Sequence, residues 1–474
     1  MNDLSYAGAL QAIAERGRFG IRLGLGRTRA LLAGLGDPQL TLRGALVAGT
    51  NGKGSVLALA GSALRVAGYR VGLTPKPHLI TYRERLEIDG RPIAPEAFAA
   101  LVAEILPIAD RVGRRLGPPT EFELLTAALF LWFRREHVDL ALVEVGLGGR
   151  LDATHAWDGG VAVITNVDLD HMAELGPTVA AIAREKAAII GRGDVAVTGA
   201  TGETRAIIAR RARRLGVSLA IAEPAPLLGW DRDGITVDLP RLGATRVGLR
   251  GRHQAANVAV ADALLDALEA AGIAHVPADA RRRGYAEARW AGRLELIETA
   301  RPGGPRQDPV EVLLDGAHNP AGAAALATAL DDLRPFLAGG RDAVPPPFTL
   351  VLGIMADKDV PSVLAALDAT ALRGARIITT QVDLPRALPA AALAAAWLAA
   401  HPRIQGSGPG IRMGTVTAIP DADAALDAAL AGAAGPVVVA GSLYLVGRAR
   451  ARLVSDPLLA DPLPRAAPPP MMAG

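Results

Sequence analysis

The sequence predicts an α/β protein with two domains. Short β-branched and leucine-rich runs alternate with alanine-rich segments of helical period, a pattern typical of a parallel sheet covered by helices. A length of 474 residues provides for two or three domains with buried cores. A stretch rich in proline and glycine, residues 301–308, separates two series of such runs. We therefore expect one α/β domain before this stretch and one after it.

The expected elements follow from the length and periodicity of each run, because buried strands are short and apolar whereas helices are longer. In the first series we expect strands at residues 45–48, 138–143, 161–165 and 195–198, and helices at 55–67, 95–115, 122–136 and 179–190. In the second series we expect strands at 310–314, 349–352, 376–379 and 436–440, separated by helices. The predicted limits are residues 1–298 for the N-terminal domain, 299–308 for the linker, 309–462 for the C-terminal domain and 463–474 for a disordered tail.

Composition excludes several classes of protein. The absence of cysteine excludes a disulfide scaffold, a zinc-thiolate site, an iron–sulfur cluster and a cysteine nucleophile. The first residues do not form a signal peptide, and no apolar run reaches the roughly 20 residues that span a bilayer. Acidic and basic residues are interspersed and aromatic residues are only 4%, which argues against a nucleic-acid partner. We expect a cytoplasmic protein without a membrane segment.

Lysine is rare in this chain. Of 51 lysine and arginine residues, only four are lysines, and the abundance of alanine, glycine and arginine indicates GC-rich codons. Such a bias installs arginine wherever a positive charge alone suffices, so each lysine is a candidate for a chemical role that arginine cannot fill. The four are Lys53, Lys76, Lys186 and Lys358.

A phosphate-binding loop follows the first predicted strand. Residues 49–55 read Gly-Thr-Asn-Gly-Lys-Gly-Ser and lead into a long helix. Glycines let backbone N–H groups face an anion, the helix N-terminus adds positive potential, and a lysine reaches the outer phosphates. The spelling differs from G-x-x-x-x-G-K-[ST], and an ordinary glycine-rich turn is the alternative. The predicted nucleotide contacts in this loop are Asn51, Gly52, Lys53, Gly54 and Ser55.

This loop resembles the ATP loop of the dihydrofolate synthase/folylpolyglutamate synthase family, relatives of the Mur cell-wall ligases. The resemblance covers almost the whole chain and implies a P-loop Mur-ligase-type N-terminal domain with a mainly parallel sheet, plus a smaller Rossmann-like α/β C-terminal domain. Eight further blocks stand in family order, beginning at Glu144, Thr165, Ile182, His253, Gly292, Asp315, Asp357 and Gly441.

The resemblance implies an ATP-dependent amide ligase that adds L-glutamate to a folate or dihydropteroate carboxylate. A carboxylate does not react with an amine at neutral pH, whereas an acyl phosphate made with ATP does. Such chemistry needs a phosphate cradle, magnesium and a second domain that delivers the amine. The implied cofactors are ATP and two magnesium ions. The sequence does not separate dihydropteroate acylation from polyglutamate extension, and the family suggests a monomer.

Metal and catalytic roles are carried over from the family to matching positions. Ser55, Glu144, His171 and a carbamylated Lys186 are the implied magnesium ligands, and Lys53, Lys186 and His318 the implied catalytic residues. From the residues alone, Glu144 could equally be a cap, His171 a structural histidine and Lys186 a solvated helix lysine. Arginine cannot form a carbamate, so the lysine count favours the functional interpretation of Lys186.

Substrate contacts are carried over in the same way. For the nucleotide, the resemblance implies Asn257, Arg293 and Asp315, which would place ATP between the domains. For glutamate it implies His318 and Ser442, which could equally be the start of a helix and a helix cap. For the pterin acid it points to segments that contain Arg27, Thr120, Phe122 and Asp152, although an aromatic residue at helical spacing is more often part of a core. Asn257 could be a helix-surface amide and Asp315 a turn former.

Lys76 departs from the family pattern. The family has Thr-Ser-Pro-His-Leu where this chain has Thr-Pro-Lys-Pro-His-Leu, residues 74–79, and the serine contributes to a magnesium site. A lysine cannot ligate a cation. Either Lys76 replaces part of the metal's charge beside the γ-phosphate or the substrate carboxylate, or it points to solvent. Two other functions stay open: a Mur-type ligase for a cell-wall precursor, which could share the loop, the metal residues and the carbamylated lysine, and, because of Lys76, a nucleotide-binding protein without catalytic activity.

Overall fold

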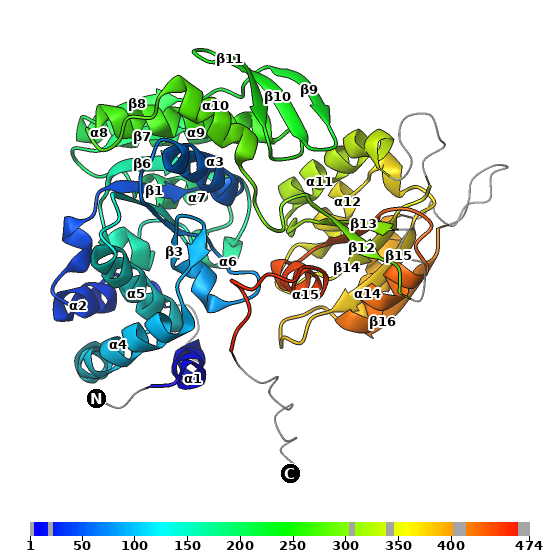
Figure 1. Cartoon of the computed structure of the whole chain (residues 1–474), viewed down its shortest axis with the longest axis horizontal. Helices are drawn as coiled ribbons and strands as arrows, with labels where there is room; N and C mark the ends of the chain where they lie inside the picture. The colour runs from blue at the N-terminus through cyan, green and yellow to red at the C-terminus, as the bar shows by residue number, and fades with distance from the viewer. Residues whose placement is uncertain (1–3, 18–21, 303–308, 338–345, 402–413, 463–474) are drawn as a thin grey trace, which may run out of the picture.

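The computed structural model describes residues 4–17, 22–302, 309–337, 346–401 and 414–462. The described chain forms two α/β regions, each built around its own mainly parallel sheet (Figure 1). This confirms the predicted fold class. No helix in these ranges is long and apolar enough to cross a membrane.

An eight-stranded sheet forms the centre of the N-terminal region, with the order β4-β3-β2-β5-β1-β6-β7-β8. Strands β2, β5, β1, β6, β7 and β8 are parallel to one another. Strands β3 and β4 form an antiparallel extension beside β2. The carboxyl ends of the parallel strands therefore share one edge, where ligands bind in open α/β sheets. The strands are β1 (Gly44–Ala48), β2 (Val71–Thr74), β3 (Glu87–Ile88), β4 (Arg91–Pro92), β5 (Leu140–Glu144), β6 (Gly160–Ile164), β7 (Val195–Thr198) and β8 (Ser218–Ile221).

Helices cover both faces of this sheet, and each face has its own hydrophobic core. On one face lie α1 (Tyr6–Gly17), α2 (Gly26–Gly34), α4 (Pro95–Leu116), α5 (Glu121–Arg135), α7 (Val179–Ala187) and α8 (Gly202–Leu215). On the other lie α3 (Lys53–Val66), α9 (Gln254–Ala270) and α10 (Ala278–Glu287). Shorter helical segments are η1 (Pro38–Thr41), η2 (Tyr82–Arg85), η3 (Ala153–Ala156) and α6 (Met172–Leu175).

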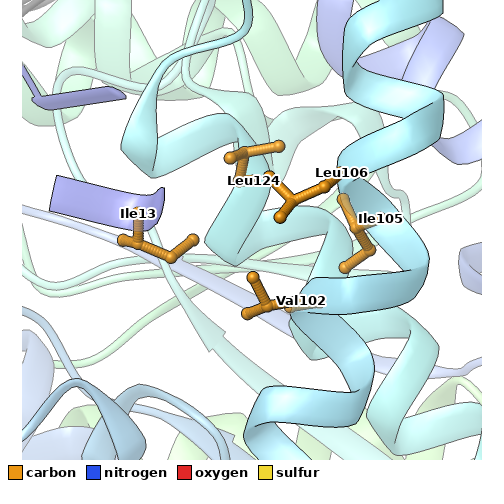
Figure 2. Close-up of a pocket in the computed structure, with 6 residues that line it drawn as sticks. Ile13, Val102, Ile105, Leu106 and Leu124 are labelled. Atoms are coloured by element: carbon orange, nitrogen blue, oxygen red, sulfur yellow. The ribbon is translucent and has the colours of Figure 1, made fainter. Parts of the chain in front are cut away.

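The N-terminal helix is held by apolar packing. Figure 2 shows Ile13 of α1 meeting Val102, Ile105 and Leu106 of α4 and Leu124 of α5. The space among these side chains leaves no room for a water molecule. Such close packing retains the dispersion contacts that a void would lose.

A small antiparallel sheet was not predicted. It consists of β9 (Leu227–Asp231), β10 (Gly234–Leu239) and β11 (Gly243–Val247), in the order β11-β10-β9. Its buried side chains, among them Ile235 and Val237, join the core formed with α3, α9 and α10. The sheet therefore packs beside α9 and α10 (Figure 1).

The C-terminal region has a six-stranded sheet in the order β12-β13-β17-β14-β15-β16, parallel except for β12. Its strands are β12 (Glu295–Ala300), β13 (Pro309–Leu314), β14 (Thr349–Leu352), β15 (Arg376–Gln381), β16 (Val416–Asp421) and β17 (Val437–Ala440). Its helices are α11 (Pro320–Leu333), η4 (Arg334–Phe336), α12 (Val360–Ala366), η5 (Thr370–Leu372), α13 (Ala390–Ala400), α14 (Ala422–Ala431) and α15 (Leu443–Leu453).

The boundary between the regions differs from the predicted one. Residues 299 and 300, which we assigned to a linker, belong to β12, which pairs antiparallel with β13 from residue 295 onward. The prediction failed because the proline- and glycine-rich stretch lies, in the sequence, between two strands that pair with each other rather than between the two regions. Residues 303–308 and the predicted tail, 463–474, lie outside the described residues.

The segment after α15 returns to the N-terminal region. Asp461 accepts hydrogen bonds from the side chains of Tyr6, Thr81 and Arg83, and the carbonyl of Ala460 accepts another from Arg83. The Arg83 side chain is only 3% exposed, so Asp461 supplies the countercharge for a buried guanidinium. This contact ties the end of the described chain to the segment that follows β2.

We predict that Asp461→Asn lowers the free energy of unfolding by about 1–3 kcal/mol, because it leaves a buried guanidinium without its charged acceptor. Thermal and urea unfolding measure the change. Asp279→Asn is the matched control, since the Asp279 side chain is 91% exposed. Equal stability of the two variants would show that the Asp461 contact contributes nothing.

Candidate active site

The predicted phosphate loop joins the buried strand β1 to α3. Gly49 (φ 153°) and Gly52 (φ 81°) have positive φ values that other residues rarely adopt. A Cβ atom on Gly49 would lie 1.8 Å from Oγ1 of Thr165, and one on Gly52 would lie 2.2 Å from Oδ1 of Asn257. The glycines therefore allow the loop to pack tightly against the residues that follow β6 and against α9.

Side chains after β6 fix the loop's conformation. The Thr165 hydroxyl donates to the Asn51 carbonyl at 2.6 Å, and the Asn51 N–H donates to Oδ1 of Asn166 at 2.9 Å. The Lys53 ammonium lies folded over the loop and donates to the carbonyls of Gly49 and Thr50, both at 3.1 Å. A preorganised cradle with its lysine in place is what phosphate binding requires.

A buried carboxylate stands beside the loop. Glu144, the last residue of β5, has its Oε1 3.8 Å from the Lys53 ammonium, and its Oε2 accepts the Lys76 N–H at 3.1 Å. Burial raises the pKa of Glu144, and the Lys53 charge opposes this change. The Lys76 ammonium donates to the Glu144 carbonyl at 2.7 Å, and burial lowers the pKa of Lys76 to about 8. Lys76 therefore points into the site, and the alternative of a solvent-facing lysine is wrong.

Lys186 and His171 lie on the same edge of the sheet. Lys186 is only 5% exposed and donates to the Gly49 carbonyl at 2.9 Å, so a solvated helix lysine is excluded. Burial lowers the pKa of Lys186 to about 7. His171 caps α6 with φ 50°, its side chain is 40% exposed, and burial of its ring lowers its pKa. Both residues face the phosphate loop from segments that follow β6.

The C-terminal region supplies the facing wall. Asp315 follows β13 and accepts the N–H groups of Leu294 and Ala317, both at 2.9 Å, so it does form the expected turn. Arg293 donates to the Gly292 carbonyl at 3.1 Å beside it. His318 Nδ1 lies 2.7 Å from the Gly316 carbonyl and therefore donates to it, which leaves Nε2 as an acceptor. Burial lowers the pKa of His318 to about 4.

Three more predicted residues, Ser442, Asn257 and Phe122, lie in or at the start of three different helices. Ser442 caps α15 and is also part of the cavity wall. Asn257 is buried on α9 and donates to Gln254, so it is not a helix-surface amide. Phe122 lies at the start of α5, behind the Thr120 cap, and faces the cavity rather than the core.

Asp152 and Arg27 differ in their access to the cavity. Both Asp152 oxygens are engaged, by the Leu147 N–H and by the N–H and hydroxyl of Thr154. Asp152 still lines the cavity, whereas Arg27 does not: its guanidinium forms an ion pair with Glu123. Arg27 therefore lies behind the cavity wall and holds Glu123, which does line the cavity.

A cavity of about 1190 Å³ joins these groups. It exceeds the roughly 300–1,000 Å³ of a typical single-ligand pocket and so has room for more than one substrate. Both regions of the chain line it. The predicted residues in its wall are Asn51, Gly52, Lys53, Gly54, Ser55, Lys76, Thr120, Phe122, Glu144, Asp152, His171, Lys186, Asn257, Arg293, Asp315, His318 and Ser442.

Sequence reasoning missed the polar contacts between the two regions. Asp170 accepts from the Lys358 ammonium at 2.8 Å and from Nδ2 of Asn319 at 3.2 Å. Nδ2 of Asn319 also donates to Oδ1 of Asn51 at 3.1 Å. Although burial opposes it, the neighbouring charges of His171 and Lys358 lower the pKa of Asp170. Only the position of these residues inside the recognised blocks could have indicated them.

Comparison with known proteins agrees with this geometry. The family "Mur ligase, glutamate ligase domain" matches residues 292–443. The dihydrofolate synthase/folylpolyglutamate synthase of Bacillus subtilis is 36% identical over 393 residues, which cover 81% of this chain and 86% of that protein. The chain belongs to the dihydrofolate synthase/folylpolyglutamate synthase family.

Solved structures of this family share the fold. Mycobacterium tuberculosis folylpolyglutamate synthase, complexed with ADP and AMPPCP, is 32% identical with a TM-score of 0.79, covering 96% of this chain and 100% of that one. Escherichia coli FolC in complex with DHPP and ADP is 29% identical with a TM-score of 0.74, covering 94% of this chain and 98% of that one. The predicted family and its Mur-ligase-type fold are confirmed.

We predict that Gly52→Ala weakens ADP binding by at least about tenfold, because the new methyl group displaces Asn257 and distorts the phosphate cradle. Isothermal titration calorimetry with ADP measures the loss.

The matched control is Gly68→Ala, which also places alanine at a positive φ (92°), just after the same helix, but with no atom within 4 Å of the new Cβ. It should lose stability without losing ADP affinity. Equal ADP affinity in both variants would contradict the cradle geometry.

Proposed function

We propose that this chain is an ATP-dependent ligase that joins L-glutamate to the carboxylate of a folate or pteroate acid through an acyl phosphate. One observation carries the proposal: a single cavity is bounded by the phosphate loop, by Phe122 and Asp152, and by His318 and Ser442 of the C-terminal region. Three substrates have to meet in such a reaction, and three distinct walls meet here.

The chemistry proceeds in two steps. A carboxylate oxygen of the acid attacks the γ-phosphorus of ATP, the bond to the β-phosphate oxygen breaks, and ADP leaves with the electron pair. The glutamate nitrogen then attacks the acyl carbon, phosphate leaves, and one amine proton is released. The fixed cations beside the loop stabilise the negative charge that both steps concentrate there.

For the nucleotide, the supported contacts are the loop N–H groups, Asn257, Arg293 and Asp315. A guanidinium matches phosphate oxygens and a carboxylate accepts ribose hydroxyls. Asp315 is held rigidly by two backbone N–H groups, and Asn257 packs directly against Gly52. ATP would then lie between the two regions of the chain, and their approach would complete the site.

Magnesium fits as an ion carried by the nucleotide. Among the described residues no group of three or more histidines and carboxylates is placed to hold a metal alone. Magnesium commonly takes one or two protein oxygens and otherwise binds phosphate and water. The Ser55 hydroxyl and the Glu144 carboxylate supply such oxygens, and His171 with a carbamylated Lys186 would supply a second set. When bound, magnesium neutralises phosphate charge.

For glutamate, the supported contacts are His318 and Ser442. Because Nδ1 of His318 donates to the Gly316 carbonyl, its Nε2 is free of a proton and can accept a hydrogen bond from the incoming amine. The low pKa keeps this ring neutral at physiological pH. We also propose that the protein acts as a monomer, in a cytoplasmic location and without a nucleic-acid partner.

A product assay tests the proposed function. Dihydropteroate, tetrahydrofolate and a cell-wall precursor acid are offered separately with glutamate and ATP, and mass spectrometry identifies the product. We expect one added glutamyl group and one ADP per amide with at least one of the first two acids. A product from the cell-wall precursor alone, or ADP binding without turnover on any acid, would overturn the proposal.

We expect Lys186→Arg to reduce ligation by at least about 100-fold, since arginine cannot form the carbamate that would turn this cation into a metal ligand. Rates of ADP release measure the effect, and circular dichroism confirms the fold. Arg184→Lys, an exposed exchange on the same helix, serves as the control. Near-normal turnover of Lys186→Arg would show that no modification is needed.

A further inference from the structure

Lys76 occupies a position that the functions assigned above do not explain. Its backbone N–H donates to the Glu144 carboxylate and its ammonium donates to the Glu144 carbonyl. Both ends of the residue are therefore anchored to the end of β5. The ammonium cannot swing out to solvent without breaking a 2.7 Å hydrogen bond.

Within the described ranges, neither of the two carboxylates near Lys76, those of Glu144 and Asp152, accepts a hydrogen bond from the Lys76 ammonium. Oε2 of Glu144 takes the Lys76 N–H, while Oε1 faces Lys53. Asp152 uses both oxygens on its own loop, in contacts with Leu147 and Thr154. In the described part of the chain, the one hydrogen bond from the Lys76 ammonium goes to an uncharged carbonyl. An ammonium has three donors, so two remain for a group that enters the cavity.

The ammonium also lies over an aromatic ring. Its nitrogen is 4.4 Å from the centroid of Phe122, which also lines the cavity. Phe122 offers a flat apolar surface, while Lys53 already serves the phosphate side through the loop. Lys76 thus stands at the junction between the nucleotide and the place for a planar acid.

We propose that the Lys76 ammonium binds the carboxylate of the acid substrate and holds it against the terminal phosphate of the nucleotide. This inference rests on the proposed function and adds a catalytic residue to it. The carboxylate oxygen and the γ-phosphate are both anions, so their approach is opposed by repulsion. A fixed cation between them reduces this repulsion while the new P–O bond forms and the bond to ADP breaks. Lys76 donates no proton in this step.

The test compares Lys76→Met, Lys76→Arg and the native full-length protein. Lys76→Met is expected to lower kcat/KM for the acid by about 100-fold, the effect of losing one oxyanion donor, and to weaken binding of the acid in the absence of nucleotide. Affinity for ADP should not change. Lys76→Arg keeps the charge and should recover part of the loss. Calorimetry measures both affinities, and steady-state kinetics separate KM from kcat.

Arg91→Met is the control for loss of one positive charge, since Arg91 lies exposed on β4 and outside the cavity wall. If Lys76→Met does not fold, Lys76→Gln, which removes the charge but keeps a hydrogen-bond donor, should lower kcat/KM for the acid in the same direction by a smaller factor. An unchanged kcat/KM for the acid, or a loss confined to nucleotide affinity, would overturn the inference. Failure of the native protein to form a glutamyl product would instead overturn the proposed function, so the two failures are distinct.

Discussion

A single buried carboxylate connects the parts of this site. Glu144 ends a strand whose residues are all buried, so its position is set by the core of the sheet rather than by a surface loop. Removing a carboxylate from water is costly unless charges and N–H groups compensate. Here Lys53 and the Lys76 segment provide that compensation, and in doing so they are fixed beside the phosphate loop. The contacts that compensate for burying Glu144 therefore also hold Lys53 and Lys76 in place before any substrate binds.

The same logic extends across the two regions of the chain. Asp170, in the segment between β6 and α6, accepts hydrogen bonds from Lys358 and Asn319, and Asn319 also contacts Asn51 of the phosphate loop. A change in the relative position of the regions therefore acts directly on the loop that would hold the nucleotide. In the proposed reaction, domain closure would act on the phosphate loop through these hydrogen bonds, because Asn319 directly follows His318, the proposed glutamate contact.

The sequence predicted most of the central strands, because buried parallel strands are short apolar runs whereas helices are longer. It predicted β7 and β14 with their observed limits, and β1 and β17 to within one residue. It missed β9 to β11, whose burial alternates or is incomplete and so produces no continuous apolar run. It also missed β12 and placed the last two residues of this strand in a linker, since an antiparallel edge strand of mixed polarity resembles a loop in composition. Most candidate site residues line one cavity, but their partners depend on long-range register that no local pattern contains.

Lysine usage shows how composition and geometry combine. All four lysines of the chain line the cavity, although the chain uses arginine for nearly every other positive charge. A guanidinium is planar and broad, and an ammonium is compact, so only lysine can fold over a tight loop as Lys53 does or fit between a strand end and a ring as Lys76 does. For Lys186, the proposed carbamate would add a requirement of reactivity rather than of shape. A codon bias that removes lysine wherever it can be replaced therefore leaves it where the shape or the chemistry of the amine is required, and those positions together outline the site.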